Sequence, residues 1–338
     1  MILPDKALSP RFPSVGLAAV LCAAFCVSIF MQGCSSSKDS FLRAQLSRSH
    51  CFFDAEKPYE DEDRIAPASP ETWEALLEFL PERAAHAAVA SRTAEDIIRL
   101  KSLKEAYEAD SLTETRLDIL ELKQSVGDRI QVASLEISAL SAQIDCEEER
   151  SEQVATFMKR KESRRDKELT VGAIVVGAAG AVATGAILLD QGENADQNTV
   201  EIIGISVGIT EAALGTALLL NKKKTEYRHP YNHLKCVWEL DPHCELIPPV
   251  VGYFLQQNGA DQRSYIERMR AEYAGFGPVS EAKNEKQRRE LEDLFFGEGG
   301  RYSGEQLVER AGMLDQFEAM VTLMKEDLRL LINIISKI

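Results

Sequence analysis

Residues 169–220 read LTVGAIVVGAAGAVATGAILL from Leu169 to Leu189, DQGENADQN from Asp190 to Asn198 and, after Thr199, VEIIGISVGITEAALGTALLL from Val200 to Leu220. Two apolar segments joined by a short polar loop predict an antiparallel helical hairpin over 169–221. Each segment carries small residues at every fourth position, a spacing that lets helix backbones approach closely. We expect the two rows to pack against each other: Ala173, Gly177, Ala181 and Gly185 from the first segment, and Gly204, Gly208, Ala212 and Thr216 from the second.

A long helical region, 70–168, precedes the hairpin. Ser69 and Pro70 suit a helix start, and no proline occurs between Pro81 and Pro230. Apolar residues then recur at steps of mostly three or four, as on one helix face: Leu112, Ile119, Leu122, Val126, Ile130, Ala133, Ile137, Leu140 and Ile144. Since a single helix of this length is not stable alone, we expect a partner helix from this chain or from another copy.

The C-terminal residues, 261–338, also read as helices. Two moderate helices are expected near 261–274 and 280–296, and the glycines at 297, 299 and 300 end the second. A capping box of Ser303 and Gln306 starts the last helix, whose apolar stripe alternates by three and four from Leu314 to Ile338. The expected fold is therefore all-α, with long helices forming an elongated bundle or a coiled coil.

The N-terminal residues have the organisation of a secretory signal peptide. Lys6 and Arg11 precede the apolar run Val15–Met31, and Gln32-Gly33-Cys34 follows. A small residue directly before a Cys resembles the processing site of bacterial lipoproteins. That family prefers Leu three residues before the Cys, where this chain has Met31.

The resemblance implies that 1–33 is a signal peptide and that Cys34 receives the lipid. Residues 34–69 would then form a lipidated tether and an acidic linker. Ser35 stands where an Asp would retain an enteric lipoprotein at the inner membrane, so the resemblance favours the outer membrane. Several acyl chains on one Cys anchor a protein stably, whereas a single chain holds it only marginally.

Four cysteines remain after such processing, and an even number suits an oxidising compartment. Of the three pairings, we favour Cys236 with Cys244, and Cys51 with Cys146. The first pair lies within 222–260, a proline-rich segment that we expect to be irregular and non-helical. The histidines 229, 233 and 243 share this segment, so zinc binding is the alternative, but a disulfide is the more economical use of two exported cysteines. We expect no metal or other cofactor.

The environment of the hairpin is left open between two interpretations. Each apolar segment is long enough to span a bilayer as a transmembrane helix, but a carboxylate such as Glu201 or Glu211 at its centre costs about 2.5–3.5 kcal/mol. In an exported chain, a two-span hairpin also leaves its basic flanks outside the cytoplasm, against the positive-inside rule. The hairpin is either buried in a helical bundle or oligomer, or it enters a membrane from outside after export.

Enzymatic and nucleic-acid functions are not expected. The net charge of −15 disfavours nucleic acid, because the phosphates would be repelled. Gly204-Ile205-Ser206-Val207-Gly208 matches the Gly-x-Ser-x-Gly pattern of hydrolases, but that chemistry requires a strand before the Ser and a helix after it. Here the pattern lies inside a predicted apolar helix.

The resemblance instead implies a lipid-anchored cell-envelope protein whose first partner is the membrane lipid, through Cys34. We expect a structural or interaction role for its long helices and hairpin, with self-association or another envelope protein as partner. The alternative is a membrane-active protein. Long helices flanking an apolar segment resemble the helical pore-forming toxins, which implies insertion of 169–221.

Overall fold

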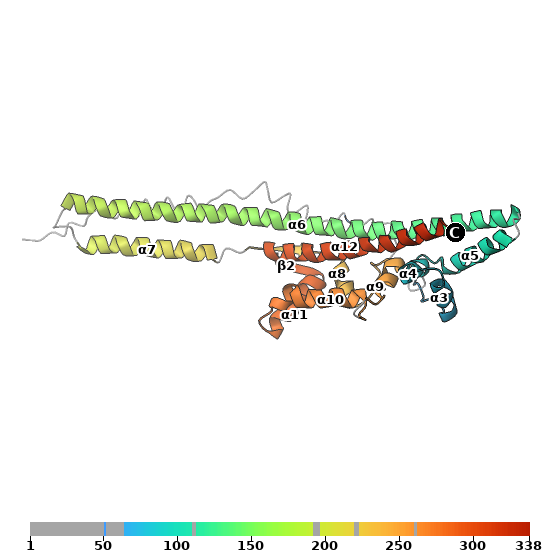
Figure 1. Cartoon of the computed structure of the whole chain (residues 1–338). Coiled ribbons are helices and arrows are strands. Elements are labelled where there is room, and N and C mark those ends of the chain that lie inside the picture. Colours follow the sequence, from blue (N-terminus) through green and yellow to red (C-terminus); the bar gives the residue numbers. More distant parts are fainter. Residues whose placement is uncertain (1–50, 52–63, 110–112, 192–196, 220–222, 260–261) are drawn as a thin grey trace, which may run out of the picture. The chain divides into compact units, whose positions relative to one another are not determined.

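The computed structural model describes residues 51, 64–109, 113–191, 197–219, 223–259 and 262–338 (Figure 1). The expected signal peptide, the expected lipidation site Cys34 and most of the expected 34–69 linker lie outside these residues. The described residues are mostly helical, and the following elements occur: α3 (Pro70–Leu77), α4 (Glu82–Ala90), α5 (Ala94–Ala109), α6 (Thr113–Gln191), α7 (Gln197–Leu219), β1 (Lys224–Arg228), α8 (His233–Trp238), α9 (Pro249–Leu255), α10 (Tyr265–Phe276), η3 (Pro278–Glu281), α11 (Glu285–Phe296), β2 (Gly299–Ser303) and α12 (Gly304–Ile335).

The chain divides into two compact units. The smaller unit contains α6 from Arg160 onward together with α7. The larger unit contains the remaining described residues, including α6 up to Lys159. Helix α6 therefore contributes to both units. It runs through Leu169 without a break, so the first helix of the expected hairpin is the end of α6 and not a separate element.

The long helical region is divided into more helices than the sequence indicated, because α4 ends at Ala90, α5 ends at Ala109 and α6 begins only at Thr113. Helix α4 ends at Ala90, and Arg92 adopts a left-handed φ of 57°. The Thr93 amide donates to Ala88 O at 2.8 Å and the Arg92 amide to Val89 O at 2.9 Å, which is the hydrogen-bond pattern of a Schellman cap. Because this cap uses Arg where Gly is usual, the sequence carried no visible stop signal between α4 and α5.

Helices α6 and α12 pack antiparallel in the larger unit (Figure 1). Ser141 of α6 and Thr322 of α12 share a hydrogen bond of 3.1 Å, whereas Gly304, at the start of α12, lies against Ala155 and Met158. On its other sides α12 contacts α4, α9 and β2. The buried apolar residues of α12 follow the expected stripe: Leu314, Phe317, Val321, Met324, Leu328, Leu331 and Ile335. Those of α6 include Val126, Ile130, Ala133, Ile137, Leu140, Ile144, Val154 and Met158.

A small antiparallel sheet was not anticipated. Strands β1 and β2 pair with Tyr227 opposite Gly300 and Thr225 opposite Tyr302, so the structure is not purely α-helical. The segment 222–260 is also not irregular throughout, because it contains β1, α8 and α9. Pro249 occupies the first turn of α9, a position that proline favours, since its missing N–H would have no helical partner there.

Within the residues that the structure describes, no helix combines the length and the apolar character needed to cross a membrane. This differs from the expectation of two segments that each suffice to span a bilayer.

Candidate functional site

The hairpin of the smaller unit is held by close packing between α6 and α7. Gly180 is buried, and a Cβ added to it would lie 2.5 Å from Val207 Cγ2, too close for any real contact. A Cβ added to Gly177 would overlap the carboxylate of Glu211. Glycine at these two positions therefore lets α7 approach α6 with a larger side chain pointing into each gap.

The expected pairing of two small-residue rows is wrong. In α7 the whole row is exposed: Gly204, Gly208, Ala212 and Thr216. No atom of another element lies within 4 Å of a Cβ built on Gly204 or Gly208. In α6, Ala173, Gly177 and Gly185 are half-buried and Ala181 is exposed, and a Cβ on Gly185 would also meet nothing within 4 Å.

The contacting faces of the two helices are rotated relative to the expected rows. Gly177 lies against Glu211, the residue before Ala212 of the expected row. Gly180 lies against Val207, and these two residues directly precede Ala181 and Gly208 of the expected rows. A shift of one residue rotates the contacting face of a helix by about 100°. Setting Val207 against Gly180 fills space that two facing glycines would leave without atomic contacts.

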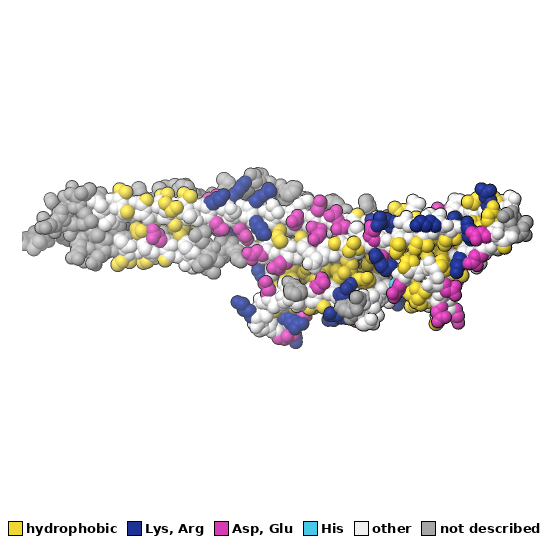
Figure 2. All heavy atoms as spheres, viewed as in Figure 1, with side chains coloured by type: hydrophobic (Ala, Val, Ile, Leu, Met, Phe, Trp, Pro, Cys, Tyr) yellow, Lys and Arg dark blue, Asp and Glu magenta, His cyan; other side chains and the backbone are white. Residues whose placement is uncertain are grey.

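This rotation leaves apolar side chains on the outward faces of the hairpin. Val182 of α6 is 72% exposed, and Ile209 of α7 is 66% exposed. Val171, Ile174, Val175 and Ile205 are likewise exposed. Figure 2 shows hydrophobic side chains along the described part of the hairpin, with basic side chains beside them. Apolar surface of this kind marks a site of interaction more often than a solvated face.

Both disulfides favoured from the sequence are present. Cys51 is bonded to Cys146 of α6, with Cα atoms 5.5 Å apart, and Cys236 of α8 to Cys244, with Cα atoms 5.9 Å apart. The sulfur atoms of Cys236 and Cys244 are therefore bonded to each other and are not thiolates that could bind zinc. Within the described ranges, no group of three or more His, Cys, Asp and Glu side chains is arranged to hold a metal ion.

A buried polar cluster lies where α6 meets the small sheet. The Arg150 guanidinium pairs with Glu147 at 2.9 Å, donates to Arg228 O at 2.8 Å and lies 4.4 Å over the Tyr227 ring. The Tyr227 hydroxyl and Ser151 share a hydrogen bond of 3.0 Å. These contacts fix strand β1 to α6 through charged and polar groups that are almost fully buried.

Arg310 of α12 forms the other half of this cluster and is 0% exposed. It donates to Phe295 O at 3.1 Å and to Asn232 Oδ1 at 3.2 Å. The Asn232 amide in turn donates to the Phe295 and Gly297 carbonyls, at 3.0 and 2.9 Å. Arg310 and Asn232 together donate hydrogen bonds to the carbonyl groups at the end of α11. They thereby connect α8, α11 and α12.

Two histidines beside Arg310 are held neutral. Burial, with a smaller contribution from the Arg310 charge, lowers the pKa of His229 to about 2 and that of His233 to about 3. His229 Nε2 and the Tyr302 hydroxyl are 3.0 Å apart, and the hydroxyl donates its proton to Leu294 O. The cluster joins its own elements together, and we interpret it as a structural feature of the larger unit.

Sequence reasoning overlooked this cluster, although a signal was present. Glu147 and Ser151 continue the apolar stripe of α6 by steps of three and four after Ile144, and both are buried. Arg310 likewise precedes Leu314 by four residues in the stripe of α12. Polar residues at core positions of a helix indicate a buried polar contact.

The positions of two glycine-containing motifs in the structure show what each motif forms. The Gly204–Gly208 pattern lies entirely within α7, so Ser206 has neither the preceding strand nor the sharp turn of a hydrolase elbow. Gly299 and Gly300, expected to follow a helix as a stop, belong to β2. The helix itself ends at Phe296 with Gly297 as its cap.

No protein-family model, curated protein or solved structure matches this chain. Its function is therefore inferred from its own residues.

Proposed function

We propose that this chain is a lipid-anchored cell-envelope protein, held by Cys34 at the outer membrane, with a structural or interaction role. The Gly33-Cys34 pair after an apolar run supports the anchor, by resemblance to bacterial lipoproteins. The two disulfides support export, because such bonds persist in oxidising compartments and are rare in the cytosol.

The observation that carries the proposal is the exposed apolar surface of the hairpin. Val182 and Ile209 project from different helices of the hairpin, and each is about two-thirds exposed or more. A two-helix hairpin does not bury both outward faces by itself, and we propose that another molecule covers them. Self-association or binding to an envelope component meets this requirement, and neither needs a catalytic site, a cofactor or nucleic acid.

In the larger unit, we propose that α6 and α12 form an antiparallel coiled coil within a helical bundle. Buried positions of α12 alternate by three and four from Leu314 to Ile335, and those of α6 do the same from Val126 to Met158 once Glu147 and Ser151 are included. This repeat is the pattern of a coiled-coil seam.

The alternative function is insertion of 169–221 into a membrane, as in helical pore-forming toxins. The same exposed surface favours it, since an inserting hairpin needs apolar outward faces. The two functions differ in what covers the hairpin and in whether membranes become permeable. Release of an entrapped dye from vesicles by the purified chain would support the pore-forming alternative.

Metabolic labelling tests the anchor. The wild-type chain, expressed in a bacterial host, should incorporate radiolabelled palmitate and fractionate with the outer membrane. Cys34→Ser should abolish the label and leave a longer, unprocessed chain, whereas Cys26→Ser, inside the apolar run, should keep both label and processing. Equal labelling of wild type and Cys34→Ser would reject the proposal.

A further inference from the structure

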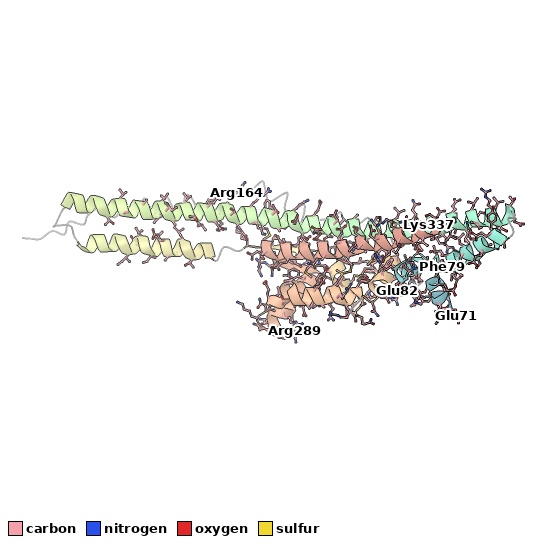
Figure 3. All side chains as sticks on the ribbon, viewed as in Figure 1. Glu71, Phe79, Glu82, Arg164, Arg289 and Lys337 are labelled. Atoms are coloured by element: carbon pink, nitrogen blue, oxygen red, sulfur yellow. A yellow bond between two sulfur atoms is a disulfide. The ribbon has the colours of Figure 1, made fainter. Side chains whose placement is uncertain are left out.

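The outward face of α6 changes character along its length. Stepping by three or four from Arg160, every residue of this face is exposed: Arg160, Arg164, Lys167, Val171, Val175, Ala178 and Val182. The first three positions are basic and the rest are apolar (Arg164 is labelled in Figure 3). Glu168 borders the same face and leaves it net positive in a chain whose overall charge is −15.

The apolar surface is not confined to α6. By helical geometry, Val171, Val175 and Val182 lie on the side of α6 opposite Gly177 and Gly180, which contact α7. Ile205 and Ile209 lie on the side of α7 opposite Val207. The hairpin thus presents apolar surface in two opposite directions.

This arrangement distinguishes between a second copy of the chain and lipid as the molecule that covers the hairpin. A second copy that docked on one face, as in a two-fold dimer, would leave the opposite face exposed. Lipid surrounds an embedded hairpin and covers both faces at once. Acyl chains can also contact the apolar residues, and anionic headgroups can pair with the basic residues that precede them on the same face of α6.

We propose that the hairpin binds an anionic membrane, with its apolar outward faces among the acyl chains and Arg160, Arg164 and Lys167 at the headgroups. This inference deepens the proposed envelope function by naming what covers the hairpin, and it rests on that function for access to a membrane. Contact of this kind does not require either helix to cross the bilayer. Long basic side chains suit the boundary, because their apolar stems lie against lipid while the charges reach water and phosphate.

A fluorescent probe on the hairpin tests the contact directly. In the full chain carrying Cys22→Ser, Cys26→Ser and Cys34→Ser, Val175→Cys would be labelled with an environment-sensitive dye. Vesicles of phosphatidylcholine with added phosphatidylglycerol, containing doxyl-labelled acyl chains, should shift the emission to the blue and quench it. The matched control is the same dye on Leu323→Cys of α12, a similarly exposed apolar position, which should stay unquenched.

Charge reversal tests the role of the basic residues. Arg160→Glu, Arg164→Glu and Lys167→Glu together should reduce the quenching at position 175 several-fold, as should high salt. The control reverses three basic residues of α11, Lys286, Arg288 and Arg289, and should leave the quenching unchanged. Circular dichroism would check that both variants remain helical, as expected for exposed positions.

Three outcomes would overturn the inference. One is the absence of quenching at position 175 with anionic vesicles. Another is equal quenching at positions 175 and 323, which would show that the N-terminal apolar run alone brings the whole chain to lipid. The third is a concentration-dependent blue shift at position 175 that needs no vesicles, which would assign the surface to a second copy. Because Cys34 is absent from this chain, these results do not depend on lipidation, and the palmitate experiment stays separate.

Discussion

Gly180 of α6 lies directly against Val207 of α7, so close that a Cβ on the glycine would lie 2.5 Å from the valine Cγ2. The valine side chain occupies the space that the missing side chain leaves. This contact, with that of Gly177 and Glu211 nearby, sets which sides of the two helices face each other and which sides stay exposed.

The geometry of this contact predicts the outcome of paired-cysteine crosslinking. Gly180→Cys with Val207→Cys should form a disulfide readily under mild oxidation, because the two positions face each other. Ala181→Cys with Gly208→Cys, one residue further along each helix, should crosslink poorly, since both positions are exposed. Non-reducing mass spectrometry of tryptic peptides measures both yields. The opposite ranking would show that the small-residue rows face each other after all.

The two disulfides should contribute unequally to stability. Cys51–Cys146 closes a sequence separation of 95 residues, and Cys236–Cys244 one of 8. The chain-entropy model gives about 4–5 kcal/mol for the long loop and about 2–3 kcal/mol for the short one. Denaturant unfolding of Cys51→Ala/Cys146→Ala and of Cys236→Ala/Cys244→Ala compares them. A greater loss from the short loop would contradict the entropic account.

Glu148 should destabilise the folded chain at neutral pH. Burial, followed by the charges of Asp315, Asp145, Glu152 and Glu318, raises its pKa from 4.5 to about 7. A raised carboxyl pKa costs nothing below the unfolded value, and its cost grows as the pH rises from 4.5 towards 7. Glu148→Gln should therefore stabilise the protein at pH 8, with no gain at pH 4. Since Glu148 is only partly buried, solvent screening should keep the gain to about 1 kcal/mol or less.

Thermal unfolding at the two pH values measures this effect. Glu149→Gln, at an exposed neighbouring position of α6, serves as the control and should change the midpoint little at either pH. A stabilisation by Glu148→Gln that is equal at pH 4 and pH 8 would argue against ionisation of this carboxyl group as its cause.

Acid should destabilise the larger unit through His229. Its pKa is lowered to about 2 by burial and by Arg310, so the folded chain keeps it neutral while the unfolded chain takes up a proton below about 6.5. The contribution of neutral His229 to stability is therefore fully present above pH 6.5. It is lost as the pH drops, by up to about 1.4 kcal/mol per pH unit. His229→Phe keeps an aromatic ring, so it should reduce the slope of unfolding free energy against pH between 6.5 and 5.

Comparing slopes, and not absolute stabilities, isolates His229. The variant also loses the hydrogen bond to Tyr302, which lowers stability at every pH, and Glu148 responds to pH with the opposite sign. Chemical unfolding of wild type and variant at several pH values gives the two slopes. Identical slopes would show that His229 is not the acid-sensitive group.

Much of the helical framework could be predicted from the sequence, because its apolar spacing reflects one buried face. The steps of three and four from Leu314 to Ile335 in α12 correspond to buried residues, as do those from Val126 to Ile144 in α6. The Ser303 capping box is present at the expected place. Both favoured disulfides occur, although spacing alone left three pairings open.

The sheet and the facing sides of the hairpin could not be predicted in the same way. Strand β1 is five residues long, only Tyr227 in it is buried, and its partner is a glycine-rich segment that resembles a helix stop. In the hairpin, apolar residues surround each helix. Periodicity therefore does not select a face, and the one-residue rotation depends on Val207 meeting Gly180.

Intact-mass and peptide mass spectrometry of the chain purified from bacterial membranes tests the central claim most directly. If the chain is a lipoprotein, its first residue is Cys34, modified by a diacylglyceryl group and usually by a third acyl chain, and no peptide from 1–33 remains. A free Cys34 thiol, or a chain that retains residues 1–33, would contradict the account.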